Sequence, residues 1–133
     1  MKYVTYLAKL SFLIFVTFSS GCSIITSCKD IGSRFCLEKW EEDDLFYLND
    51  KLNYDQYGSG KIGGPVINIG WDSNYILAER KSNFRGEPSG WMIVDKDGGV
   101  VSGPYDRSSP LLLEKLSNIK VKSSSQAWSE LSY

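Results

Sequence analysis

The sequence contains no histidine and only three cysteines in its 133 residues. Histidine is the commonest general base and a frequent metal ligand, so its absence excludes Ser-His and Cys-His nucleophile pairs and every histidine-containing zinc site. A strong excess of either charge is also lacking, because the formal net charge is -1. The first 21 residues hold Lys2, Lys9 and no acid, which leaves -3 for the remainder and argues against nucleic acid as a partner.

No apolar run is long enough to cross a membrane, which takes about 20 residues. The run Leu10–Phe18 instead follows a basic start and precedes the small residues Ser19, Ser20 and Gly21. This order is typical of a secretory signal, and the alternative is a buried helix of the mature fold. The whole chain is 42% hydrophobic and 14% aromatic, a composition that predicts one packed globular domain.

The stretch Ser19-Ser20-Gly21-Cys22 resembles the lipobox of bacterial lipoproteins. The resemblance implies cleavage before Cys22 and attachment there of a diacylglyceryl group and a further acyl chain such as palmitate, which together anchor a protein stably in a membrane. Ser19 stands where the family most often has leucine, so an ordinary signal peptide cut nearby is the alternative. Ser23 after the cysteine implies the outer membrane, facing the periplasm, if the host is Gram-negative.

Cys28 and Cys36 remain as an even pair in a chain that the signal directs to an oxidising compartment. A disulfide between them would close a short loop and stabilise the fold by roughly 2 to 3 kcal/mol. Two free thiols are the alternative. A metal site is less favoured, because two cysteines leave a thiolate ligand set incomplete.

These features divide the chain into a signal peptide (1–21), a tether with the disulfide loop (22–40) and a domain (41–133). The acidic run 41–44 at its start is typical of a solvated turn. Beyond it, strands are expected at 45–48, 65–71, 75–80, 91–95 and 100–102, with a long loop over 49–64. In the second of these, alternation places Ile67, Ile69 and Trp71 on one face. Short connections such as 72–74 and 97–99 predict an antiparallel meander.

The C-terminal part is expected to be helical. Ser109 and Pro110 are typical of a helix start, and Leu112, Leu113 and Leu116 share one face. Residues 119–122 alternate like an edge strand, whose lysines protect it from further pairing. Ser123 and Gln126 then have the spacing of a capping box. The sequence therefore predicts an α+β fold, a small antiparallel meander sheet packed by C-terminal helix.

Three stretches, 70–78 (GWDSNYILA), 91–95 (WMIVD) and 102–105 (SGPY), resemble a group of small uncharacterised bacterial lipoproteins. That group shares a Trp-Asp-x-x-Tyr-Ile hairpin, a second aromatic strand ending in Asp and a Gly-Pro turn into the last helix. The resemblance covers roughly residues 44–120 and implies no known activity. A purely structural role also accounts for these residues, because cross-strand aromatic pairs stabilise sheets.

The long loop carries the candidate functional residues. Tyr47, Tyr54 and Tyr57 form a candidate partner-binding surface, since tyrosine gives large contact area at low entropic cost. Asp50 and Asp55 lie among them, so a carboxylate-dependent hydrolase of cell-wall glycan is the enzymatic alternative.

Two short motifs are rejected. Gly58-Ser-Gly-Lys61 lacks the Ser or Thr and the first glycine of a phosphate-binding loop. Asp95-Lys-Asp97-Gly98 resembles a calcium loop, but Gly99 and Asp106 stand where an oxygen ligand and a glutamate are needed, so a hairpin turn is expected. The sequence thus favours a membrane-anchored envelope lipoprotein that is not an enzyme, needs no cofactor or metal and binds a protein partner. A purely structural envelope component is a further alternative.

Overall fold

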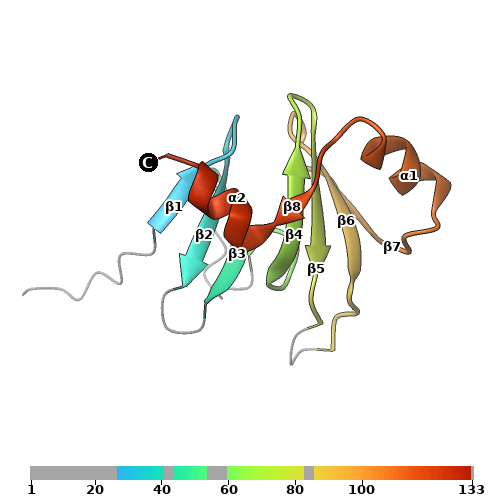
Figure 1. The fold of residues 1–133 in the computed structure, drawn as a ribbon, viewed down its shortest axis with the longest axis horizontal. Helices are drawn as coiled ribbons and strands as arrows, with labels where there is room; N and C mark the ends of the chain where they lie inside the picture. The colour runs from blue at the N-terminus through green and yellow to red at the C-terminus, as the bar shows by residue number, and fades with distance from the viewer. Residues whose placement is uncertain (1–26, 41–43, 54–59, 83–85, 133) are drawn as a thin grey trace, which may run out of the picture.

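The computed structural model describes residues 27–40, 44–53, 60–82 and 86–132, which form two antiparallel sheets and two short helices (Figure 1). The three-stranded sheet has the order β1-β2-β3, and the five-stranded sheet has the order β7-β6-β5-β4-β8. In chain order the elements are β1 (Ser27–Asp30), β2 (Phe35–Trp40), β3 (Leu45–Asp50), β4 (Val66–Trp71), β5 (Tyr75–Arg80), β6 (Gly90–Asp95), β7 (Val101–Tyr105), α1 (Pro110–Leu116), β8 (Lys122–Ser123) and α2 (Ser124–Glu130). The predicted α+β class is confirmed, with two sheets where the sequence suggested one.

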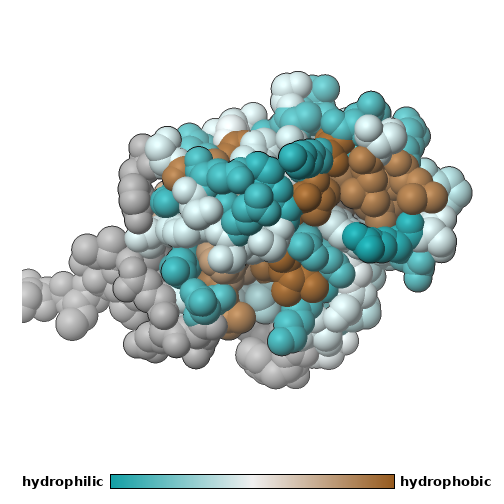
Figure 2. Space-filling model, viewed as in Figure 1, coloured by the Kyte–Doolittle hydropathy of each residue, from teal (hydrophilic) through white to brown (hydrophobic). Residues whose placement is uncertain are grey.

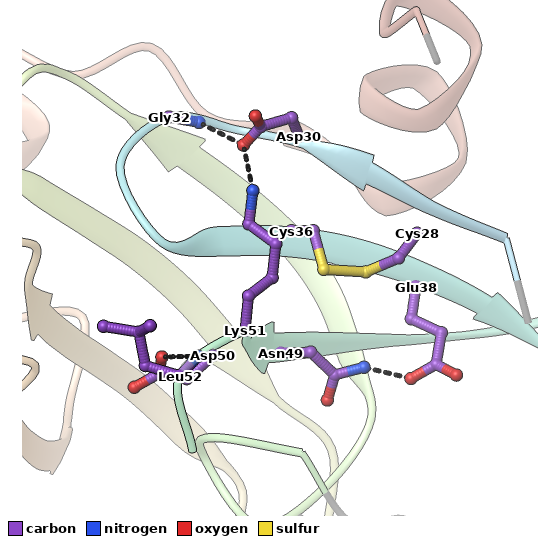
Figure 3. The surroundings of a disulfide bond; sticks show 9 residues. All are labelled: Cys28, Asp30, Gly32, Cys36, Glu38, Asn49, Asp50, Lys51 and Leu52. Atoms are coloured by element: carbon purple, nitrogen blue, oxygen red, sulfur yellow. Dashed lines mark hydrogen bonds and ion pairs between the residues drawn. A yellow bond between two sulfur atoms is a disulfide. The ribbon is translucent and has the colours of Figure 1, made fainter. Parts of the chain in front are cut away.

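The segment 27–40 differs from the expected tether. It forms β1 and β2, and Phe35 and Leu37 are fully buried in the core. The intervening residues Cys36 and Glu38 point to the other face, as the two-residue period of a strand requires. The predicted disulfide joins Cys28 to Cys36 across this strand pair, with 5.5 Å between the two Cα atoms (Figure 3).

The hairpin of β4 and β5 turns at Asp72, as the sequence predicts. The Asp72 carboxylate accepts hydrogen bonds from the backbone N–H groups of Asn74 and Tyr75 at 2.8 and 2.7 Å. One residue departs from the expected alternation: Ile67 is exposed, whereas Ile69 is fully buried. A bulge between Val66 and Asn68 shifts the register by one residue, so Val66 points into the core in place of Ile67.

Both faces of the five-stranded sheet are covered. On one face, Ile76, Ala78, Met92 and Val94 share a single hydrophobic core with the inner face of the three-stranded sheet. On the other face, Leu112 of α1 packs against a second, smaller core formed by Leu77, Trp91, Ile93 and Ile119. Neither helix of the described residues has the length and hydropathy to cross a membrane.

Helix α2 lies across the junction between the two sheets (Figure 1). The predicted capping box is half formed, because Ser123 Oγ accepts the Gln126 N–H at 3.2 Å. Trp128 reaches the three-stranded sheet, where its ring centroid lies 6.1 Å from that of Phe46 and Lys29 Nζ donates to its carbonyl at 3.1 Å. Ser124 Oγ donates to the Val66 carbonyl of β4 at 2.6 Å. The helix is therefore fixed to both sheets.

Polar groups join the sheets at one end of the shared core. Lys96, in the turn after β6, is buried and its Nζ donates to the Ile31 carbonyl at 2.8 Å. Burial lowers the pKa of this lysine, and the nearby Asp72 and Asp30 carboxylates offset part of that effect. In the same turn Gly99 has φ +69°, and a Cβ there would lie 1.9 Å from Arg34 Nη2. The positive φ favours glycine at this position, and a side chain there would also displace the end of Arg34.

Candidate binding groove

A groove of about 320 Å³ lies between α2 and the β4 edge of the five-stranded sheet. Its volume is at the small end of ligand pockets, which span roughly 300 to 1,000 Å³. Three parts of the chain supply its lining: β4, the segment that enters β8, and the end of α2. The lining residues are Ile69, Trp71, Lys120, Lys122, Ala127, Glu130 and Leu131.

The floor of the groove is apolar and its rim is charged. Ile69 and Ala127 are buried in the core beneath it, and the half-buried Trp71 and Leu131 stand at its sides. Gly70 lies between the lining residues Ile69 and Trp71 on β4, and a Cβ there would lie 2.5 Å from the Lys120 carbonyl oxygen. The missing side chain lets the segment before β8 approach the strand closely and carries Lys120 to the rim.

Electrostatics at the rim favour an anion. Glu130 forms an ion pair with Lys122 and accepts a hydrogen bond from Gln126 Nε2 at 3.2 Å. The hydrogen bond from Lys122, followed by that from Gln126, lowers the pKa of Glu130, and the positive charge of Lys120 adds to the effect. Lys120 is exposed and forms no ion pair with any residue that the structure describes. The described lining therefore holds two positive charges and one negative charge, whereas residues 22–133 as a whole carry a formal net charge of -3.

The predicted tyrosine surface lies only partly within the described residues. Tyr47 is half-buried in β3, and its ring centroid is 5.3 Å from that of Trp40 on β2. Such a tilted aromatic pair stabilises the strand pairing. Tyr54, Tyr57 and Cys22 lie outside the described residues, so a partner-binding role of the three tyrosines and lipid attachment at Cys22 stay predictions.

Asp50 does not lie in an open loop, as the sequence suggested, but ends β3 with its carboxylate fully buried. That carboxylate pairs with Arg34 at 2.8 Å and with Lys61 at 3.3 Å, and it accepts the Leu52 N–H at 3.0 Å. Burial raises its pKa, but the Leu52 hydrogen bond and the two cations outweigh burial and lower the pKa overall. A carboxyl that stays ionised and enclosed is suited to holding the fold and not to donating a proton. Asp55, its predicted partner, lies outside the described residues.

The two rejected motifs have structural roles where the structure describes them. Lys61 supplies one of the cations beside Asp50. Asp95 closes the predicted hairpin turn, since its carboxylate accepts the Asp97 N–H at 2.9 Å and its carbonyl accepts the Gly99 N–H at 2.8 Å. No three His, Cys, Asp or Glu side chains of the described segments lie close enough to hold a metal ion.

An apolar patch lies over α1, on the face of the molecule that Figure 2 shows. It includes Leu111 and Leu113, which are 44% and 51% exposed on either side of the buried Leu112. Leu113 was expected on the buried face together with Leu112, but only one side of this short helix meets the sheet. The groove is the better candidate site, because concave sites that combine apolar surface with a few polar groups are the usual form of ligand pockets.

Sequence reasoning did not assemble the groove. The sequence predicts Lys120 and Lys122 as the protecting lysines of an edge strand, and it predicts Trp71 on the apolar face of the strand 65–71. Lys122 does lie in an edge strand, β8, which pairs with β4 through two residue pairs only. In the sequence, Lys120 and Lys122 precede the capping box and Glu130 follows it, which could have placed the three charges near one another. Nothing in the sequence indicates that Trp71 lies beside them.

A scan against models of known protein families finds no match to this chain, and neither a search of curated protein sequences nor a search of solved structures finds one.

Proposed function

We propose that this protein is a bacterial envelope lipoprotein, anchored through Cys22, whose α+β domain binds a protein partner. The observation that carries the binding role is the groove beside α2, with its apolar floor of Ile69 and Ala127 below a charged rim. Concave, mostly apolar sites with a few oriented polar groups are the usual form of binding sites. The lipobox-like stretch before Cys22 supports the anchor.

The walls of the groove are fixed by contacts with the rest of the domain. Its α2 wall is held by the Ser124 hydrogen bond to β4 and by the packing of Trp128 on the other sheet. A site that is formed before binding loses little conformational entropy on association. Asp50, the carboxylate of the enzymatic alternative, is committed to its ion pairs, which favours a binding role over catalysis.

The anchor and the binding site require separate experiments. The intact mass of the protein purified from membranes, with and without Cys22→Ala, tests the anchor: an N-terminal fragment beginning at Cys22 and carrying diacylglyceryl and acyl groups is expected. An unmodified N-terminus would contradict it.

For the binding site, a photo-crosslinking amino acid replaces Gln126, whose side chain is bonded to the rim residue Glu130, and a matched probe replaces Glu114 on α1. We expect one discrete crosslinked protein from the Gln126 position only. Equal products from both positions, or none from Gln126, would contradict a binding role for the groove.

A further inference from the structure

We infer that the groove takes a peptide segment in which a carboxylate neighbours an apolar side chain, and that Glu130 occupies the position of that carboxylate when the groove is empty. The inference rests on the proposed binding function and names the chemistry of the partner. It follows from the arrangement of charges at the rim and from the shape of the floor.

The rim carries more positive than negative charge. Among the described lining residues, Lys122 and Lys120 face one anion, Glu130, which is held by Lys122 and Gln126. The Glu130 side chain is 46% exposed, so it can turn to solvent at small cost when another anion replaces it. Glu130 Oε2 therefore marks where a ligand oxygen would meet Lys122, and Lys120 is left as a second cation for the same ligand.

The floor accepts a short apolar group. Ile69 and Ala127 close it from below, and the Trp71 ring and Leu131 flank it. A volume of about 320 Å³ suits one or two side chains better than a long acyl chain, which needs a deeper apolar cavity. Charge and shape together select an acidic, apolar peptide over a neutral peptide or a free fatty acid.

Competition between Glu130 and the ligand gives the inference an unusual consequence. Replacing Glu130 by glutamine removes the internal competitor and leaves both lysines in place. Affinity for an acidic peptide should then rise by about twofold to fivefold, the range that an exposed ion pair is worth. Replacing both lysines by glutamine should lower it by about tenfold.

The experiment titrates the isotope-labelled full chain with three probes, followed by two-dimensional amide NMR. The probes are a capped heptapeptide of alternating leucine and glutamate, the same peptide with glutamine for glutamate, and dodecanoate below its micelle concentration. The proteins are the wild type, Glu130→Gln, the double variant Lys120→Gln with Lys122→Gln, and Glu114→Gln as a control with the same charge change on α1. Thermal denaturation checks that each variant is folded.

We expect the acidic peptide to shift the Trp71 indole and Lys120 amide signals, to bind Glu130→Gln more tightly and the double variant more weakly, and to bind Glu114→Gln like the wild type. Equal binding of the glutamine peptide, preferential binding of dodecanoate, shifts confined to α1, or an unchanged or weaker affinity of Glu130→Gln would each overturn the inference. A discrete crosslinked partner at Gln126 together with any of these results would leave the binding function standing and remove only the acidic ligand.

Discussion

Replacing Asp50 by asparagine should destabilise the protein more than any single change at an exposed charge. The substitution keeps the size of the side chain but removes the negative charge opposite Arg34 and Lys61, 2.8 and 3.3 Å away. Breaking a buried pair costs about 3 to 5 kcal/mol, because the remaining charge stays desolvated. Arg34 and Lys61 keep 22% and 18% of their side chains exposed, so they recover some hydration and the lower end, about 3 kcal/mol, applies.

Urea denaturation at pH 7 measures this loss. With a slope of about 1.5 kcal/mol per molar urea, the midpoint should fall by about 2 M. The matched control is Asp44→Asn, because Asp44 pairs with Lys39 at 3.3 Å with its side chain 83% exposed. That change should cost below about 0.5 kcal/mol. A shift in Asp50→Asn no larger than in the control would refute the assignment of Asp50 as a buried ion-pair centre.

The unfolding free energies of the wild type and of Asp50→Asn should depend differently on pH. The pKa of Asp50 is lower in the folded protein than in the unfolded chain. Its stabilisation is therefore fully present above the ordinary aspartate pKa of about 3.9 and is lost as the pH falls through the lowered folded-state value. The difference in unfolding free energy between wild type and Asp50→Asn should shrink over that acidic range, and a difference that stays constant with pH would contradict the electrostatic origin.

Three further changes test other parts of the fold. The double variant Cys28→Ala with Cys36→Ala opens a covalent loop of sequence separation 8 and should lower the free energy of unfolding by about 2.5 kcal/mol. Reduction of the wild type should reproduce this loss, and an unchanged denaturation midpoint would contradict it. Gly70→Ala places a methyl group 2.5 Å from the Lys120 carbonyl oxygen, so it should lower the free energy of unfolding by about 1 to 3 kcal/mol and shift the NMR signal of the Lys120 amide. An unperturbed amide signal would show that this contact does not set the position of Lys120. Leu112→Ala removes the one buried side chain of α1 and should cost about 2 to 5 kcal/mol by denaturation, whereas a cost below about 1 kcal/mol would show that α1 is not part of the core.

Local patterns in the sequence predict much of this fold. The structure confirms three predictions that depend only on neighbouring residues: the returning strand over Tyr75–Arg80, the turn at Asp72 and the capping contact between Ser123 and Gln126. Pro110 at the start of α1 and the pairing of Cys28 with Cys36 are equally local.

Features that depend on distant contacts were not predictable. The segment 27–40 mixes polar and apolar residues, as a tether does. Its two strands are stabilised by the packing of Phe35 and Leu37 against the inner face of the five-stranded sheet, which lies far away in the sequence. The bulge that turns Ile67 outward is set by the pairing of β4 with β5. The groove joins Trp71 to Leu131 through the docking of α2, which no spacing along the chain encodes.

The position of the disulfide determines how the domain bears tension. Cys28 is the second residue of β1, and its bond to Cys36 makes residues 28–36 a covalently closed ring. A pull on the chain before Ser27 therefore cannot peel Lys29 and Asp30 away from β2. The load passes directly into β2, the central strand of its sheet, which is paired on both sides. If Cys22 holds a lipid, the linkage between membrane and domain would yield only when that central strand is pulled out, and not at the sheet edge.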